Sequence, residues 1–111
     1  MQFSLRVICH NQHSNTAYER IQNITKELGI PCSSRFEAYW KDPQCSLFEL
    51  GESTKEFSTE LICKHIRNIA GSSEIVITES ANDREISHYA SYDEMMNDTY
   101  CTFVVCNLFE L

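Results

Sequence analysis

Residues 53–71, STKEFSTELICKHIRNIAG, carry the clearest helical pattern in the chain. Ser53 and Glu56 have the spacing of a capping box, in which each side chain accepts a hydrogen bond from an unpaired backbone N–H at the helix start. Gly71 can adopt the left-handed conformation that ends a helix. One broad stripe at helical spacing is apolar and is expected to face the core: Phe57, Leu61, Ile62, Ile66, Ile69 and Ala70. The sequence therefore predicts an amphipathic helix over residues 53–71.

Short apolar runs lie on both sides of this helix. Residues 47–50 precede it and residues 75–77 follow it, which indicates the order strand, helix, strand. Further towards the N-terminus, residues 2–10 alternate between apolar and polar side chains, as a half-buried strand does. Residues 16–28 then have helical spacing, with Thr16 and Glu19 as a second capping box and Gly29 at the stop.

A β-hairpin is predicted between the two helices. Residues 35–41 alternate, Asp42 and Pro43 are typical of a turn, and residues 45–50 supply the partner strand. The element order is then β-α-β-β-α-β, and residues 100–108 add a C-terminal strand of high β propensity. We therefore expect one α+β domain over residues 1–111, a two-layer sandwich of ferredoxin-like βαββαβ arrangement with an additional C-terminal strand. The predicted core includes Phe3, Leu5, Val7, Ile21, Ile24, Leu28, Phe57, Leu61, Ile66, Ile75, Ile77 and Phe103.

The composition is typical of a soluble globular protein, with 42% hydrophobic and 23% charged residues among 111. No apolar run approaches the roughly 20 residues that span a bilayer, and the N-terminus lacks the pattern of a signal peptide. Four of the six cysteines lie in apolar periodic segments, and none of the spacings is typical of zinc sites. We therefore expect reduced thiols, a cytoplasmic location and no membrane association.

The negative charge is concentrated in one segment. Residues 1–78 contain nine acidic and eight basic residues, a net charge of −1, whereas residues 79–98 contain six acidic residues and one basic residue, a net charge of −5. Tyrosines are interleaved there, and aromatic anchors with steering charges are typical of protein interfaces. The predicted partner-binding residues are Asp83, Glu85, Tyr89, Tyr92, Asp93, Glu94 and Asp98. The alternative interpretation is an acidic loop that only keeps the protein soluble.

No catalytic motif is present, and we predict neither enzymatic activity nor a cofactor. The three glycines stand apart, so no phosphate-binding loop is indicated, and the acidic pI of about 5.0 disfavours direct nucleic-acid binding. A metal site could be built only if strand and helix brought together Cys9, His10, His13, Cys63 and His65. Cys63 and His65 point in nearly opposite directions on a helix, so we expect a structural His65, surface His10 and His13, and no metal.

In its size, its acidity and its lack of catalytic motifs, the chain resembles bacterial immunity proteins, the antitoxins that neutralise nuclease toxins. The resemblance implies an inhibitory protein that occludes the active site of a basic partner, a nuclease toxin. Phage-encoded nuclease inhibitors, including anti-CRISPR proteins, share this character. A different class is also open: a ferredoxin-like small-molecule-binding or enzymatic domain that acts as a dimer, with a pocket lined by His10, His13 and His65. The sequence leaves monomer and dimer unresolved.

Overall fold

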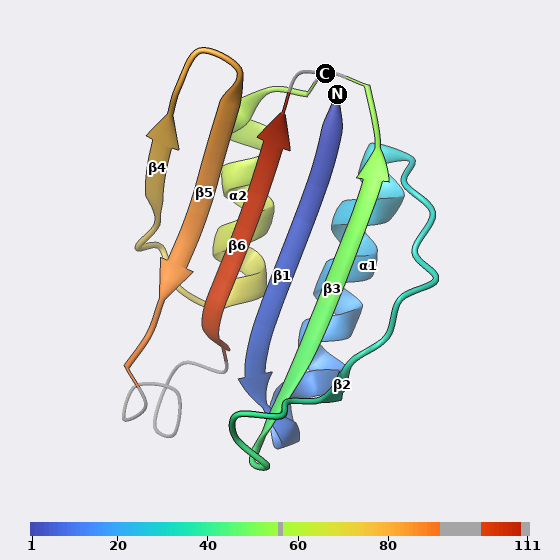
Figure 1. Cartoon of the computed structure of the whole chain (residues 1–111), viewed down its shortest axis with the longest axis vertical. Helices are drawn as coiled ribbons and strands as arrows, with labels where there is room; N and C mark the ends of the chain where they lie inside the picture. The colour runs from blue at the N-terminus through green and yellow to red at the C-terminus, as the bar shows by residue number, and fades with distance from the viewer. Residues whose placement is uncertain (56, 92–100, 110–111) are drawn as a thin grey trace.

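A computed structural model of the chain describes residues 1–55, 57–91 and 101–109. These residues form a six-stranded, wholly antiparallel sheet and two α-helices that cover one of its faces (Figure 1). The elements follow in the order β1 (Gln2–His10), a 3-10 turn (Asn11–His13), α1 (Ser14–Leu28), β2 (Glu37–Ala38), β3 (Cys45–Ser53), α2 (Thr59–Ala70), β4 (Val76–Glu79), β5 (Asp83–Tyr89) and β6 (Cys101–Phe109). The predicted two-layer α+β architecture is confirmed.

Strand β1 lies in the middle of the sheet and pairs along its length with β3 on one side and β6 on the other. Its alternation is that predicted from the sequence, because every second side chain points towards the helices and is at most 1% exposed: Phe3, Leu5, Val7 and Cys9. α1 lies behind β1 and β3, and α2 lies behind β5 and β6 (Figure 1). The core is the layer between these helices and the sheet.

Both helices end as the sequence predicts. Gly29 has a φ of +66° and Gly71 a φ of +69°, so each adopts the left-handed conformation after the last helical residue. The N–H of Ile30 donates to the carbonyl of Thr25 at 2.8 Å, which is the long hydrogen bond of a Schellman motif. The start of α1 differs by one short turn from the expectation, since the helix begins at Ser14 and Thr16 lies inside it.

The predicted capping box at Ser53 and Glu56 is wrong in position. Ser53 is the last residue of β3, where it pairs with Gln2, because the strand continues past Leu50. Helix α2 begins instead at Thr59, and the Ser58 hydroxyl caps it by accepting a hydrogen bond from the Leu61 N–H at 3.2 Å. Glu56 lies outside the described residues. Pairing with β1 thus places in β3 a residue that local spacing assigned to the helix.

The strand order also differs from the expected ferredoxin-like arrangement. There, the strand after the second helix pairs with the first strand, but here β6 holds that place and the order is β2-β3-β1-β6-β5-β4. β4 forms the far edge, and the chain returns inward through β5 to β6. The sequence predicts β6 as a strand that extends the sheet, but it predicts no strand over residues 83–89. Of the β5 side chains that face the helices, only Ile86 is apolar, so the period-two signal is weak.

The predicted hairpin is present, but β2 is shorter than the expected strand over residues 35–41. The turn begins at Tyr39, whose carbonyl accepts from the Asp42 N–H at 3.3 Å, and the Asp42 carboxylate accepts from the Gln44 N–H at 2.9 Å. Trp40 therefore lies in the turn and not in a strand. Phe36, just before β2, packs against Tyr18 and Phe48.

The exposed fractions of the apolar side chains refine the predicted core. Ile77 was expected in the core but is 46% exposed, because β4 lies at the edge of the sheet beyond the helices. Leu61 was expected on the inner face of α2 and is only partly buried, whereas Ile62, Ile66 and Ile69 are fully buried. The inner face of α2 is thus centred away from Leu61.

This packing predicts different costs for two truncations in α2. Ile66→Ala should lower the free energy of unfolding by about 2–5 kcal/mol, since it leaves a cavity in the closed core. Leu61→Ala should cost clearly less, since Leu61 already contacts water. Urea unfolding of the two variants and the parent measures both values. Equal costs would mean that the inner face of α2 has been misplaced.

Candidate functional site: the open face of the sheet

The face of the sheet opposite the helices carries the candidate site. Figure 1 looks directly onto this face, and within the described residues no helix covers it. We call it the open face. Strand registers place directly opposed residues in rows across it, because paired residues of an antiparallel ladder point to the same side.

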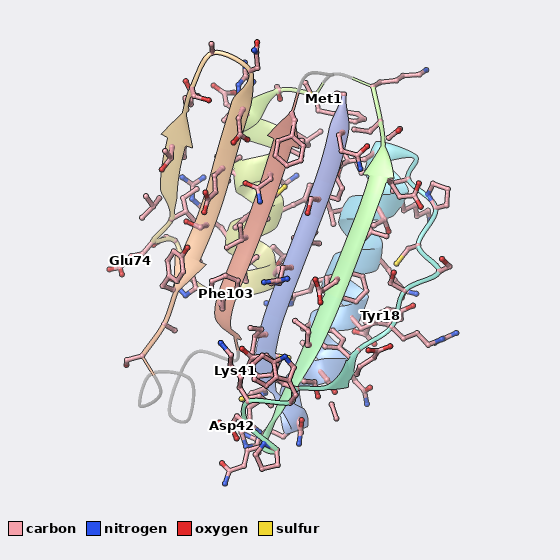
Figure 2. The ribbon with its side chains drawn as sticks, viewed as in Figure 1. Met1, Tyr18, Lys41, Asp42, Glu74 and Phe103 are labelled. Atoms are coloured by element: carbon pink, nitrogen blue, oxygen red, sulfur yellow. The ribbon has the colours of Figure 1, made fainter. Side chains whose placement is uncertain are left out.

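One row of the open face is apolar and runs across four strands. Leu47 is opposite Ile8, Ile8 is opposite Phe103, and Phe103 is opposite Tyr89. The rings of Tyr89 and Phe103 meet edge to face, with centroids 5.1 Å apart, and Tyr89 is 58% exposed. Phe103 lies on the side of the sheet nearest the viewer in Figure 2. Tyr89 is exposed and Phe103 is partly buried, and an aromatic pair of this geometry offers a rigid contact area to a partner.

Acidic side chains share the β5 end of the open face with Tyr89. Asp83, Glu85 and Tyr89 lie on the same face of β5, with the buried Ser87 between Glu85 and Tyr89. Arg84 points to the helix side and donates to the Thr59 hydroxyl at 2.8 Å. One carboxylate oxygen of Asp83 is buried without a hydrogen-bond partner among the described residues. We call Asp83, Glu85 and Tyr89 the acidic β5 face.

The acidic β5 face contains three of the seven residues predicted to bind a partner. The regular strand that brings these three together was not predicted. The other four, Tyr92, Asp93, Glu94 and Asp98, lie outside the described residues. Sequence reasoning also missed Phe103 as a surface residue, since it assigned this ring to the core. Its alternation with the buried Val104 carries no information about which face is covered.

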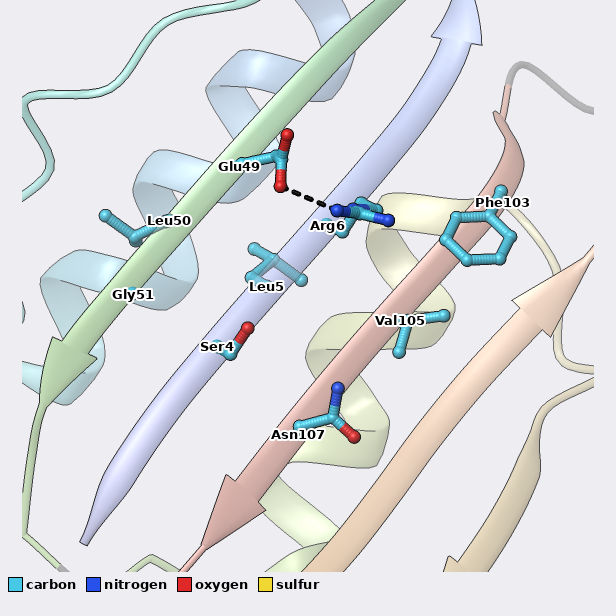
Figure 3. A pocket seen from close by; sticks show the side chains of 9 residues that line it. All are labelled: Ser4, Leu5, Arg6, Glu49, Leu50, Gly51, Phe103, Val105 and Asn107. Atoms are coloured by element: carbon cyan, nitrogen blue, oxygen red, sulfur yellow. Dashed lines mark hydrogen bonds and ion pairs between the residues drawn. The ribbon is translucent and has the colours of Figure 1, made fainter.

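A hollow of about 450 Å³ lies beside the apolar row (Figure 3). Short side chains explain it, because Gly51, Ser4 and Asn107 are opposite one another in the second row of the open face from the apolar row. Arg6 and Glu49 line it as well and form an ion pair at 2.8 Å, with both side chains 53% exposed. Their charged groups are accessible for recognition because both side chains are exposed, and an exposed pair of this kind contributes little to stability.

The β2–β3 turn presents a second exposed aromatic residue. Trp40 is 79% exposed, its ring lies against Tyr39, and the Lys41 ammonium lies 5.0 Å from the ring centroid. This turn is at one end of the sheet, as the labelled Lys41 and Asp42 show in Figure 2. A single tryptophan two residues before Asp42 and Pro43, which are typical of a turn, is the sequence signal that could have identified it.

The histidines do not form the pocket that would favour a small-molecule domain. His10 and His13 contact each other near the N-terminus of α1, with ring centroids 6.2 Å apart. The pKa of His13 is lowered, mainly because the ring is partly buried and secondly because the His10 ring is close to it. His65 is buried and lies 2.5 Å from the Glu27 carboxylate, near the C-terminus of α1. Fourteen residues separate His13 from Glu27, about 21 Å along a helix. His65 thus joins the two helices, far from the other pair.

No three histidine, cysteine or acidic side chains of the described residues are placed to share a metal ion. The described cysteines are free thiols, and four of them are buried: Cys9, Cys45, Cys63 and Cys106. Burial raises the pKa of the Cys106 thiol, and burial together with the Asp42 carboxylate raises that of Cys45 to about 11. Neither helix of the described chain is long and apolar enough to cross a membrane.

Compared with known protein families, curated proteins and solved structures, the chain has no significant match. The functional argument therefore rests on the residues and geometry of the chain itself.

The burial of the thiols predicts their reactivity. In a Cys101→Ser background, Ellman's reagent at about pH 8 should modify the partly exposed Cys32 promptly in the folded protein, and the four buried thiols only after denaturation. A thiol with a pKa of about 11, such as Cys45, is about one part in a thousand thiolate at that pH. Prompt modification of several thiols in the folded protein would contradict the packing described above.

Proposed function

We propose that the protein is an inhibitory binding protein, an immunity protein that neutralises a basic nuclease toxin by occluding its active site. The observation that carries the proposal is the acidic β5 face: two carboxylates and a half-exposed tyrosine of one strand, on a face that no described helix covers. Cationic active-site clefts, such as those that bind nucleic acids, are complementary to such a surface.

The arrangement of the open face supports a protein partner. Aromatic anchors and a hollow beside them suit the side chains of a protein surface, and Glu85 and Asp83 lie on the same face further along β5. In interfaces, a few buried aromatic contacts supply most of the binding energy, while rim charges accelerate association. The apolar row would therefore slow dissociation, and Asp83 and Glu85 would steer the basic partner.

The segment that follows β5 extends the same chemistry in sequence. Tyr92, Asp93, Glu94 and Asp98 lie between Ser91 and Cys101, which connect to the ends of the neighbouring strands β5 and β6. We include these four residues in the proposed recognition surface. Residues 79–98, which include β5 and this segment, carry a net charge of −5 out of the total of −7, whereas residues 1–78 are nearly balanced at −1.

The proposal is tested on the product of the gene next to that of this protein. The purified protein should bind that product and abolish its cleavage of plasmid DNA at equimolar concentration. Retention of full nuclease activity in the presence of excess protein would refute the proposal for this partner, and a neighbouring gene for a metabolic enzyme would favour the small-molecule alternative.

Charge substitutions then test the surface. Glu85→Lys, and separately Asp93→Asn with Glu94→Gln, should each weaken binding at least tenfold, which is about 1.4 kcal/mol, mainly through slower association at low salt. Tyr89→Ala should act mainly on dissociation. The matched control is Glu19→Lys, the same charge change on the exposed side of α1. Thermal unfolding verifies that the variants fold. Equal binding by all variants would place the interface elsewhere, first around Glu37 on the open face.

A further inference from the structure

We infer that the outer edge of β4 binds an extended, basic segment of the partner by strand addition, so that this segment becomes a seventh strand of the sheet. The inference rests on the proposed function, because it takes the partner to be the same basic protein. It assigns the binding mode to the backbone of β4, a site distinct from the side chains of the acidic β5 face.

The hydrogen-bond pattern of the β4–β5 hairpin shows which backbone groups point outward. The Ser80 N–H donates to the Asp83 carbonyl at 2.8 Å, so these residues form a hydrogen-bonded pair. Such pairs alternate along an antiparallel ladder, and the register therefore makes Thr78–Glu85 and Val76–Ser87 hydrogen-bonded pairs as well. The N–H and C=O groups of Ile77 and Glu79 consequently point away from β5, towards solvent.

β4 is short and carries the charged Glu79, but it lacks the other features with which proteins usually protect exposed strands. Those features are lysine, proline, a bulge or a covering element. β4 has none of these residues, its four side chains are all exposed, and the sheet of described residues ends at it. Val76 on the open face is 57% exposed and Ile77 on the helix side is 46% exposed. Two exposed β-branched apolar side chains on opposite faces suit contact with a neighbouring strand on both sides of the sheet.

Charge selects the occupant of this edge. Residues 74–89 contain Glu74, Glu79, Asp83 and Glu85 against Arg84 alone, a net charge of −3. Glu74 lies two residues before β4, at the left margin of the sheet in Figure 2. A second copy of the chain would bring its own Glu74 and Glu79 to the same edge, and like charges on paired strands are destabilising. A strand that carries lysine or arginine gains from the same charges.

The outward groups also define the order of side chains in the bound segment. In an antiparallel addition, the residue opposite Glu79 is expected to be basic, and the residue opposite Ile77, two positions further on, is expected to be apolar. Both of these residues exchange backbone hydrogen bonds with β4. The residues opposite Thr78 and Val76 lie on the open face, where β-branched side chains fit best.

Proline substitution at position 77 tests strand addition selectively. Ile77→Pro removes only an outward N–H, since the ladder to β5 uses Val76 and Thr78, and edge strands tolerate proline in such positions. The variant should bind the partner at least tenfold more weakly than the control Ile77→Ala, which loses side-chain contact but keeps the N–H. Thermal unfolding establishes that both variants fold.

Amide hydrogen exchange followed by NMR gives a readout that side-chain recognition alone would not alter. In the free protein, the Ile77 and Glu79 amides should exchange quickly, and those of Val76 and Thr78 slowly. In the complex, the first two should become protected. A short synthetic peptide that contains the sequence Lys-Val-Val-Val, with lysine opposite Glu79 and valines opposite Thr78, Ile77 and Val76, should protect the same two amides at high concentration. Its counterpart with glutamate in place of lysine should not.

The outcomes separate the two proposals. If Glu85→Lys weakens the complex but Ile77→Pro binds like Ile77→Ala and the two amides remain unprotected, strand addition is wrong and the proposed function stands. If the neighbouring gene product is not inhibited but the lysine peptide protects both amides, the proposed function fails for that partner and the edge site stands. Protection in the isolated protein that grows with its concentration would overturn the inference, because the occupant would then be a second copy.

Discussion

The structure depends on the burial of one face of β1. Phe3, Leu5, Val7 and Cys9 are almost fully buried, and the strand is paired along both of its edges. A strand in this position cannot shift by one residue, because every apolar side chain would then turn away from the helices. Its register therefore sets those of β3 and β6, and the two helices must lie on the side to which these four residues point.

This constraint produces the candidate site indirectly. With both helices on one side, the other side of six strands has no described cover, and its rows carry an aromatic pair, a hollow and the acidic β5 face. Because β6 pairs with β1, β5 lies beside β6 in the sheet interior and β4 forms the edge. The two surfaces that we propose for recognition, one of side chains and one of backbone, thus follow from the same arrangement of strands.

Local signals were reliable where they depend on near neighbours. The left-handed glycines at positions 29 and 71, the alternation of β1 and the turn at Asp42 are all present as predicted. They were wrong where the conformation of a segment depends on the strand that pairs with it. Ser53 has the spacing of a helix cap, yet it continues β3 because Gln2 pairs with it. Residues 83–89 lack a clear period, yet they form a strand because β4 and β6 supply hydrogen bonds on both sides.

The sequence by itself determined the class of the fold, the two amphipathic helices, the central strand and the concentration of acidic residues after position 78, because composition and short-range periodicity encode these properties. Only the tertiary structure decided the order of the strands, the exposure of Ile77 and Phe103, and the alignment of Asp83 and Glu85 with Tyr89. The physical reason is that an alternating strand specifies two faces but not which face is covered or which strand lies beside it. Those choices depend on the total area buried when distant segments pair.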